Sequence, residues 1–147
     1  MEILFVNKTK TEIPETFLMD WSEAIVSSLV ERDVLIPSEV EELVAVFVDE
    51  EKIRELNLNF RSKDKATDVL SFAPVEESSL GELVFCIEVI RENAKEHKLS
   101  FEQELAYMYL HGVLHLLGFE HETNEEDAKE MFDLQDSIFE NLSGQFC

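Results

Sequence analysis

The sequence predicts an α+β fold in which a mixed sheet of about four strands packs against about five helices. Short apolar runs of strand length alternate with longer segments whose apolar residues recur every three or four positions. The chain of 147 residues contains no linker, internal repeat or break in composition. Its hydrophobic content of 45% is enough for one core and excludes a disordered chain. We therefore expect a single domain over residues 1–147.

The first half of the chain predicts a strand, a helix, a second strand and a second helix. Residues 2–7 are rich in Ile, Leu, Phe and Val, which favours a strand. Pro14 suits the first turn of a helix, and apolar residues at helical spacing follow it as far as Val30. The apolar run at residues 42–48 indicates a buried strand, and residues 50–59 show helical spacing again.

The middle of the chain adds two strands and a short helix. Residues 67–73 and 82–87 are apolar runs that predict strands. The polar segment between them contains Pro74 and Gly81, which is typical of a loop. Residues 89–97 then favour a short helix.

Two further helices are expected in the last third of the chain. Ser100 and Gln103 form a capping box for the first of them, and Gly118 is a natural stop. Thr123 and Glu126 form a second capping box for the final helix. The predicted packing face of that final helix comprises Ala128, Met131, Phe132, Gln135, Ile138 and Phe139.

Three of the four histidines lie in the segment "HGVLHLLGFEH", which begins at His111. His111 and His115 are four positions apart on a predicted helix, so their Cβ atoms lie roughly 5–6 Å apart on one face. Gly118 lets the chain turn back, so His121 can reach the same point. Three imidazoles leave a fourth position of a zinc ion open, as catalytic zinc sites do. The spacing thus predicts a zincin-like three-histidine site that binds one Zn²⁺ per chain.

The carboxylate that a zinc peptidase needs is absent from this segment. Metzincin peptidases use the same spacing but place a glutamate directly after the first histidine, where this chain has Gly112. Glu120 adjoins a ligand in a turn and is expected to point away from the ion. Glu104, seven residues before His111, is either a partner of a ligand histidine or an ordinary helix residue. A metallopeptidase-like hydrolase therefore remains an alternative, weakened by the missing base.

The formal net charge of −21 argues against non-specific binding to phosphate backbones, because the overall field repels polyanions. The positive charges are nevertheless unevenly distributed along the chain. A basic cluster places five of the twelve basic residues within fourteen positions: Lys52, Arg54, Arg61, Lys63 and Lys65.

The sequence favours a cytoplasmic protein that does not enter the membrane. No apolar run reaches the length of a membrane span, and the N-terminal residues resemble a strand rather than a signal peptide. Cys86 and Cys147 are the only cysteines. Cys86 lies in an apolar run and Cys147 is terminal, so we expect no disulfide between them and a reducing compartment.

Two blocks of the sequence resemble the YbeY-type endoribonucleases, which act in bacterial ribosomal RNA maturation. "HGVLHLLGFEH" is similar to the family's H-G-x-L-H-L-x-G-Y-D-H. "LNLNFRSKDKATDVLSFA" at residues 56–73 is similar to the family's L-N-x-x-[FY]-R-x-x-D-x-P-T-D-V-L-S-F, and "GELVFCIEV" resembles a third, weaker block. The block order and chain length also fit. The chain departs from the family pattern at Ala66, Glu82, Phe119 and Glu120, where Pro, Asp, Tyr and Asp are usual.

The resemblance implies a zinc-dependent, single-strand-specific endoribonuclease of ribosomal RNA maturation and ribosome quality control. His111, His115 and His121 match the zinc ligands, with His111 and Arg61 as catalytic residues. The implied partners are a ribosomal RNA precursor and ribosomal components, with no DNA expected. A further alternative is a ribosome assembly factor whose metal is mainly structural.

RNA cleavage also explains the missing glutamate and the basic cluster. Zinc lowers the pKa of its bound water to about 7, so less is required of a protein carboxylate. Arg61 can stabilise charge on a phosphate through paired hydrogen bonds, and the basic cluster is expected to face the zinc site. Lys63, Asp68 and Ser71 are further candidates for substrate binding. Asp68 and Ser71 equally suit a role in satisfying backbone groups near a strand end.

Overall fold

The computed structural model describes residues 1–146 and confirms the predicted fold class. The fold is α+β, with a mixed sheet of four strands and five helices among the described residues. Cys86 is buried and is a free thiol among these residues. Cys147, which we expected not to pair with it, lies outside the described residues.

The strands pair in the order β1-β2-β4-β3. Strands β1, β2 and β4 are mutually parallel, and β3 joins β4 in the antiparallel sense, so β3 forms one edge of the sheet. The predicted strand at residues 67–73 was too long at both ends, since β3 covers Val69–Phe72. Just before it, the Asp68 carboxylate accepts a hydrogen bond from the Val69 N–H at 2.8 Å. The strands are β1 (Glu2–Asn7), β2 (Glu42–Val48), β3 (Val69–Phe72) and β4 (Ser79–Cys86).

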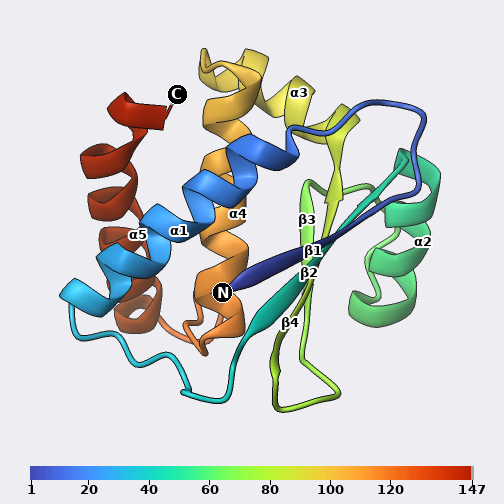
Figure 1. Ribbon diagram of the computed structural model, residues 1–147. Helices are drawn as coiled ribbons and strands as arrows, with labels where there is room; N and C mark the ends of the chain where they lie inside the picture. The colour runs from blue at the N-terminus through green and yellow to red at the C-terminus, as the bar shows by residue number, and fades with distance from the viewer. Residues whose placement is uncertain (147) are drawn as a thin grey trace.

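Helices cover both faces of this sheet and enclose two apolar cores (Figure 1). The larger core lies under α1, α4 and α5, and includes the fully buried Trp21 and Tyr109. The smaller core lies under α2 on the opposite face and includes Ile53 and Leu70. The helices are α1 (Glu15–Glu31), α2 (Glu50–Arg61), α3 (Ile87–His97), α4 (Phe101–Leu116) and α5 (Glu125–Phe146).

Local sequence signals set both ends of α4. The Ser100 hydroxyl accepts a hydrogen bond from the Gln103 N–H at 3.1 Å, and the Gln103 side chain accepts one from the Ser100 N–H at 2.8 Å. This confirms the predicted capping box. Gly118, with φ of 101°, turns the chain just after the helix ends at Leu116. Glycine adopts this left-handed conformation without a Cβ penalty, so the chain can fold back toward α4.

The predicted second capping box, at Thr123 and Glu126, is wrong. Helix α5 begins at Glu125, and the Asn124 side chain accepts the hydrogen bond from the Asp127 N–H at 2.8 Å. The Thr123 hydroxyl instead donates to the Asp127 carboxylate at 3.3 Å. Asparagine caps a helix at least as well as threonine, and it stands one position nearer the helix.

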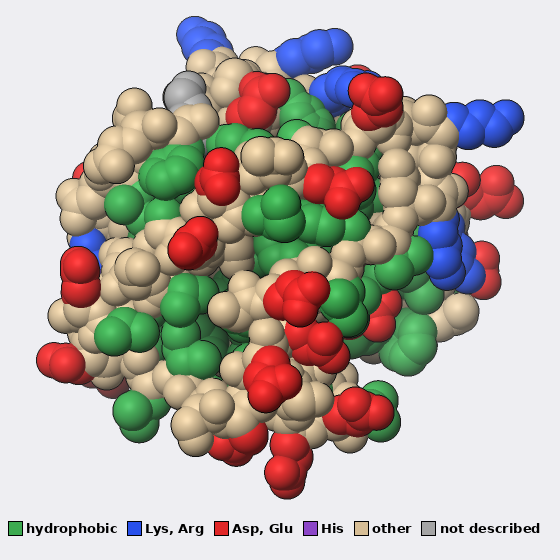
Figure 2. All heavy atoms as spheres, in the orientation of Figure 1, with side chains coloured by type: hydrophobic (Ala, Val, Ile, Leu, Met, Phe, Trp, Pro, Cys, Tyr) green, Lys and Arg blue, Asp and Glu red, His purple; other side chains and the backbone are tan. Residues whose placement is uncertain are grey.

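The surface reflects the acidic composition. Figure 2 shows acidic side chains spread over one face, with most of the visible basic side chains along its upper and right-hand rim. None of the helices in residues 1–146 combines the length and the apolar character that a membrane span requires.

Candidate metal centre

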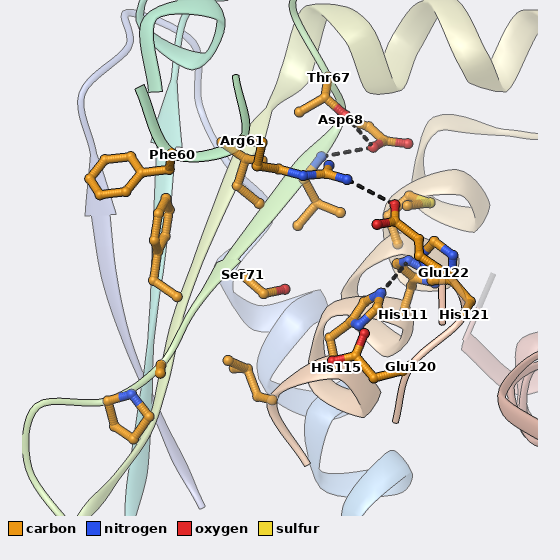
Figure 3. A pocket seen from close by; sticks show the side chains of 17 residues that line it. Phe60, Arg61, Thr67, Asp68, Ser71, His111, His115, Glu120, His121 and Glu122 are labelled. Carbon is orange, nitrogen blue, oxygen red and sulfur yellow. Dashed lines mark hydrogen bonds and ion pairs between the residues drawn. The ribbon is translucent and has the colours of Figure 1, made fainter. Parts of the chain in front are cut away.

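The structure brings the three histidines of the conspicuous segment together. His111 and His115 project from the last two turns of α4, and the turn at Gly118 returns His121 to them (Figure 3). Their candidate ligand atoms all lie within 4.8 Å of one another, and the Nε2 atoms of His111 and His115 are 3.1 Å apart. Two nitrogens bound to one zinc ion at about 2.1 Å each lie at most about 4.2 Å apart. The three side chains therefore could hold one metal ion after small rotations of the rings.

The local environment keeps the imidazoles of His111 and His115 in the neutral form that metal ligands require. Burial, followed by the neighbouring histidines His111 and His121, lowers the pKa of His115 to about 4. Burial also lowers the pKa of His111, against a smaller opposing effect of its hydrogen bond to Gln135. At neutral pH both rings present a lone pair rather than a positive charge.

Gln135 of α5 determines which nitrogen of His111 is available to a metal. The amide nitrogen of Gln135 donates to the backbone carbonyl of Tyr107 at 3.3 Å, so its amide oxygen faces Nδ1 of His111 at 3.0 Å. Since that oxygen can only accept, Nδ1 of His111 carries the proton and Nε2 keeps its lone pair. Sequence reasoning missed this contact. The one available signal was a glutamine, fully buried in the structure, on an otherwise apolar helix face.

Glu104 does not act as a partner of a ligand histidine. Its carboxylate is buried and pairs with Nδ1 of His97 at 2.5 Å, so the first of the two alternatives for Glu104 is wrong. His97 is exposed, as expected, and the hydrogen bond that it donates to Glu104, followed by the charge of that carboxylate, raises the pKa of His97.

Gly112 occupies the position of the peptidase glutamate and faces the sheet. A Cβ atom built on this buried glycine comes within 2.6 Å of Cδ2 of Leu83, a side chain of β4 with no exposed surface. Helix α4 therefore packs so closely on β4 that a side chain at position 112 would have to displace the buried Leu83. A carboxylate at this position would start out toward Leu83, and Gly112 is not among the described residues that line the histidine cavity.

The histidines open into a cavity of about 640 Å³ between α4, the edge strand β3 and the end of α2. Arg61 enters the cavity from the last turn of α2, and its Nη2 atom lies 2.9 Å from Oε1 of Glu122. Figure 3 shows this guanidinium pointing toward the histidine side of the cavity. Asp68 and Ser71 also line the cavity, with Asp68 half-buried and Ser71 exposed.

Comparisons with known proteins agree with these features. A family model described as "Endoribonuclease YbeY" matches residues 4–143. The chain belongs to the YbeY endoribonuclease family. It is 48% identical over 143 residues to a protein named "Endoribonuclease YbeY" from Bdellovibrio bacteriovorus, covering 97% of this chain and 95% of that protein.

Other YbeY relatives span nearly the same length. The protein of that name from Sulfurihydrogenibium sp. is 42% identical over 148 residues, covering 95% of this chain and 92% of the relative. A Thermotoga maritima protein solved in solution superposes with a TM-score of 0.65 at 34% identity, covering 97% and 90% of the two chains. The resemblance inferred from the two sequence blocks is thus confirmed.

Most residues of the basic cluster do not face the histidines as expected. Arg54 pairs with Asp64 at 2.7 Å, and Lys52 lies 3.7 Å from Glu55. Among the five basic residues of the cluster, the described cavity lining contains Arg61 alone. Lys63 is exposed and lies outside that lining. The expectation that the whole cluster faces the histidines is therefore wrong, because neighbouring carboxylates hold two of its members elsewhere.

Glu120, in the loop between α4 and α5, contradicts a second expectation. This residue belongs to the cavity lining, and Figure 3 shows its carboxylate beside His115 rather than turned away. The YbeY pattern usually has aspartate here, so the chain keeps a carboxylate at this point. Glu120 faces the cavity because the loop that carries it, with His121 and Glu122, lines the cavity.

Proposed function

We propose that this chain is a metal-dependent endoribonuclease that hydrolyses single-stranded RNA, with a ribosomal RNA precursor as its substrate. The observation that carries the proposal is the convergence of three histidine side chains and one guanidinium in a single cavity. Membership in the YbeY family and the names of its relatives support the endoribonuclease activity. Zinc is the proposed ion, because three histidines with an open fourth position suit it. We also propose a cytoplasmic location and contact with ribosomal components.

Arg61 is the residue that we assign to the scissile phosphate. A divalent ion bound by the three histidines would supply Lewis-acid activation of water and of the phosphodiester. The Arg61 guanidinium offers a planar pair of donors to the phosphate oxygens as negative charge accumulates. In the structure one of these donors, Nη2, is held by Glu122 in an exposed ion pair. Such a pair contributes about 0–1 kcal/mol, so an incoming phosphate can replace Glu122 readily.

The other candidate residues take different parts in this proposal. The Asp68 carboxylate accepts hydrogen bonds from the Val69 N–H at 2.8 Å and the Asn93 amide at 3.3 Å. We therefore assign Asp68 to shaping the start of β3, and Ser71, whose exposed hydroxyl faces the cavity, to substrate contact. We assign Lys63, which is exposed and outside the cavity lining, to contact with substrate phosphates outside the cavity.

The activity is tested with purified protein, single-stranded and duplex RNA, and a peptide library, each with zinc and with chelator. We expect zinc-dependent cleavage of single-stranded RNA alone. Arg61→Ala should retain its metal and lower the cleavage rate by roughly 10²-fold, the scale of removing one transition-state donor. Arg61→Lys should recover only part of the rate, because lysine lacks the planar fork.

Arg54→Ala is the matched control, since Arg54 lies on the same helix in an exposed ion pair outside the cavity lining. We expect it to cleave at the wild-type rate. Rates within about twofold of wild type for both Arg61 variants at equal salt would remove Arg61 from the mechanism.

The two alternatives have distinct outcomes in the same experiments. Zinc-dependent hydrolysis of peptides without RNA cleavage would favour a metallopeptidase, which the closed environment of Gly112 opposes. Binding to ribosomal components that survives chelation, with no cleavage of RNA, would favour an assembly factor with a structural metal.

A further inference from the structure

The cavity has a second, aromatic end that the proposed chemistry does not use. Phe60 lies in the last turn of α2, directly before Arg61, and is 66% exposed. Its ring meets Phe72 of β3 edge to face, with ring centroids 5.0 Å apart and planes at 76°. Both rings line the same cavity as the histidines. Figure 3 places Phe60 at the end opposite the histidines, with Arg61 and Ser71 between them.

Packing of the protein core does not account for the position of Phe60. Phe72 packs against the smaller core beneath α2, so its ring is held in place from behind. Phe60 rests edge to face on Phe72 and leaves most of its surface in solvent. A large aromatic side chain gains little free energy of folding when it is this exposed. The pair therefore forms a supported aromatic surface that opens into the cavity.

We propose that Phe60, supported by Phe72, stacks against an unpaired nucleobase next to the cleaved phosphate. This inference rests on the proposed function and names the place where one base of its single-stranded substrate would bind. Phe60 and Arg61 are consecutive residues, so one helix end presents a ring for a base and a guanidinium for a phosphate. Bases in a duplex are already stacked on one another and cannot reach such a surface, whereas an unstacked base can.

The acidic charge of the chain strengthens the case for stacking. A protein of net charge −21 gains little from its overall field when it binds a polyanion. Stacking on an aromatic ring depends on contact area rather than on long-range charge, so it supplies affinity that the surface charge does not. We expect the Phe60 contribution to change little with salt, while that of Arg61 decreases as salt rises.

The test is a mutant cycle between the protein and its substrate. Cleavage of a short single-stranded RNA by the zinc-loaded protein is measured for a series of oligonucleotides, each with one abasic nucleotide. We expect one abasic position near the cleavage site to lower kcat/KM by about 5- to 160-fold, the range for loss of one stacked base. Phe60→Ala should lower kcat/KM on the intact RNA by the same factor, yet have less than about a twofold effect on that abasic RNA.

Three further variants define the result. Phe60→Trp should cleave at least as well as wild type, and Phe60→Leu should lose most of what Phe60→Ala loses, because leucine is apolar but offers no π-face. Leu58→Ala is the matched control, since Leu58 is 46% exposed on the same helix and lies outside the cavity lining. It should leave kcat/KM unchanged. Metal content and melting temperature are measured for every variant to confirm that the fold is intact.

The outcomes separate this inference from the proposed function. If wild type cleaves RNA but Phe60→Ala matches it, or if Phe60→Leu matches it, stacking is overturned and the endoribonuclease stands. Losses that simply add between Phe60→Ala and every abasic position also overturn stacking, and indicate instead a docking site for an apolar group of another molecule. If zinc-loaded wild type cleaves none of the RNAs, the proposed function itself fails.

Discussion

Replacement of Gln135 by methionine should weaken metal binding although all three ligand histidines are unchanged. Methionine has nearly the volume and length of glutamine, so the buried space on α5 stays filled. The change removes the acceptor for Nδ1 of His111, 3.0 Å away, and the donor to the Tyr107 carbonyl, 3.3 Å away. His111 then loses the contact that keeps its proton on Nδ1.

The expected size of the effect follows from the geometry. Loss of a hydrogen bond that orients a ligand histidine lowers metal affinity by about 10- to 100-fold, which corresponds to about 1.4–2.7 kcal/mol. The buried Tyr107 carbonyl also loses a donor, which costs roughly 1–3 kcal/mol of folding stability. Gln135→Glu retains an acceptor for His111 but places a carboxylate against that carbonyl, so we expect it to lose stability as well.

Two measurements separate positioning from general destabilisation. Competition with a chelator gives the zinc dissociation constant, and ¹⁵N spectra of the metal-free protein report the His111 tautomer. We expect the Nδ1–H form in wild type and a mixture in Gln135→Met. Ile138→Val, a buried change on the same helix, should cost about 0.5–1.5 kcal/mol of stability yet leave zinc affinity unchanged. An unaltered dissociation constant and tautomer in Gln135→Met would refute the assignment.

The remaining predictions concern the ligand set and a distant ion pair. His115→Ala should lose zinc and RNA cleavage together while remaining folded. Chelation should lower the melting temperature of wild type but not of this variant. Equal shifts of the melting temperature in both proteins would show that the ion that stabilises the fold is not bound by His115. The raised pKa of His97 means that its pairing with Glu104 contributes stability fully below about pH 6.5 and loses it as the pH rises through the folded-state pKa. Urea unfolding in the presence of chelator measures how much His97→Ala lowers the free energy of unfolding, and this decrease should be larger at pH 6 than at pH 9. An equal decrease at both pH values would show that the pair does not titrate in this range.

Local signals explain what the sequence predicted well. The limits of α4 follow from the capping box at Ser100 and the glycine at 118, and the helical repeat places His111 and His115 on one face. The start of α5 was predicted one residue too early, with Thr123 as the cap instead of Asn124. Both residues can cap a helix, and the sequence alone does not show which of the two does so. Each of these features depends on a few consecutive residues.

Features of the site that depend on distant segments were not predictable in this way. The contact between Gln135 and His111 joins α5 to α4, and the ion pair between Arg61 and Glu122 joins residues 61 positions apart. The redirection of Arg54 to Asp64 likewise depends on how the chain turns after α2. The clustering of basic residues along the chain therefore predicted a positively charged surface beside the histidines that the folded protein does not form.

Gly112 shows how packing, rather than ligand spacing, limits the reaction. Successive residues of a helix point about 100° apart, so the residue after the first ligand faces sideways from the metal. A peptidase of this spacing uses that direction for its glutamate. Here β4 occupies it, since Leu83 stands 2.6 Å from the position of a Cβ on Gly112. The helix can therefore supply two ligands but no base, and the cavity groups that can act on a substrate come from α2, from β3 and from the loop around His121. Arg61 is the positively charged member of that set, and a phosphate is the substrate group that it suits.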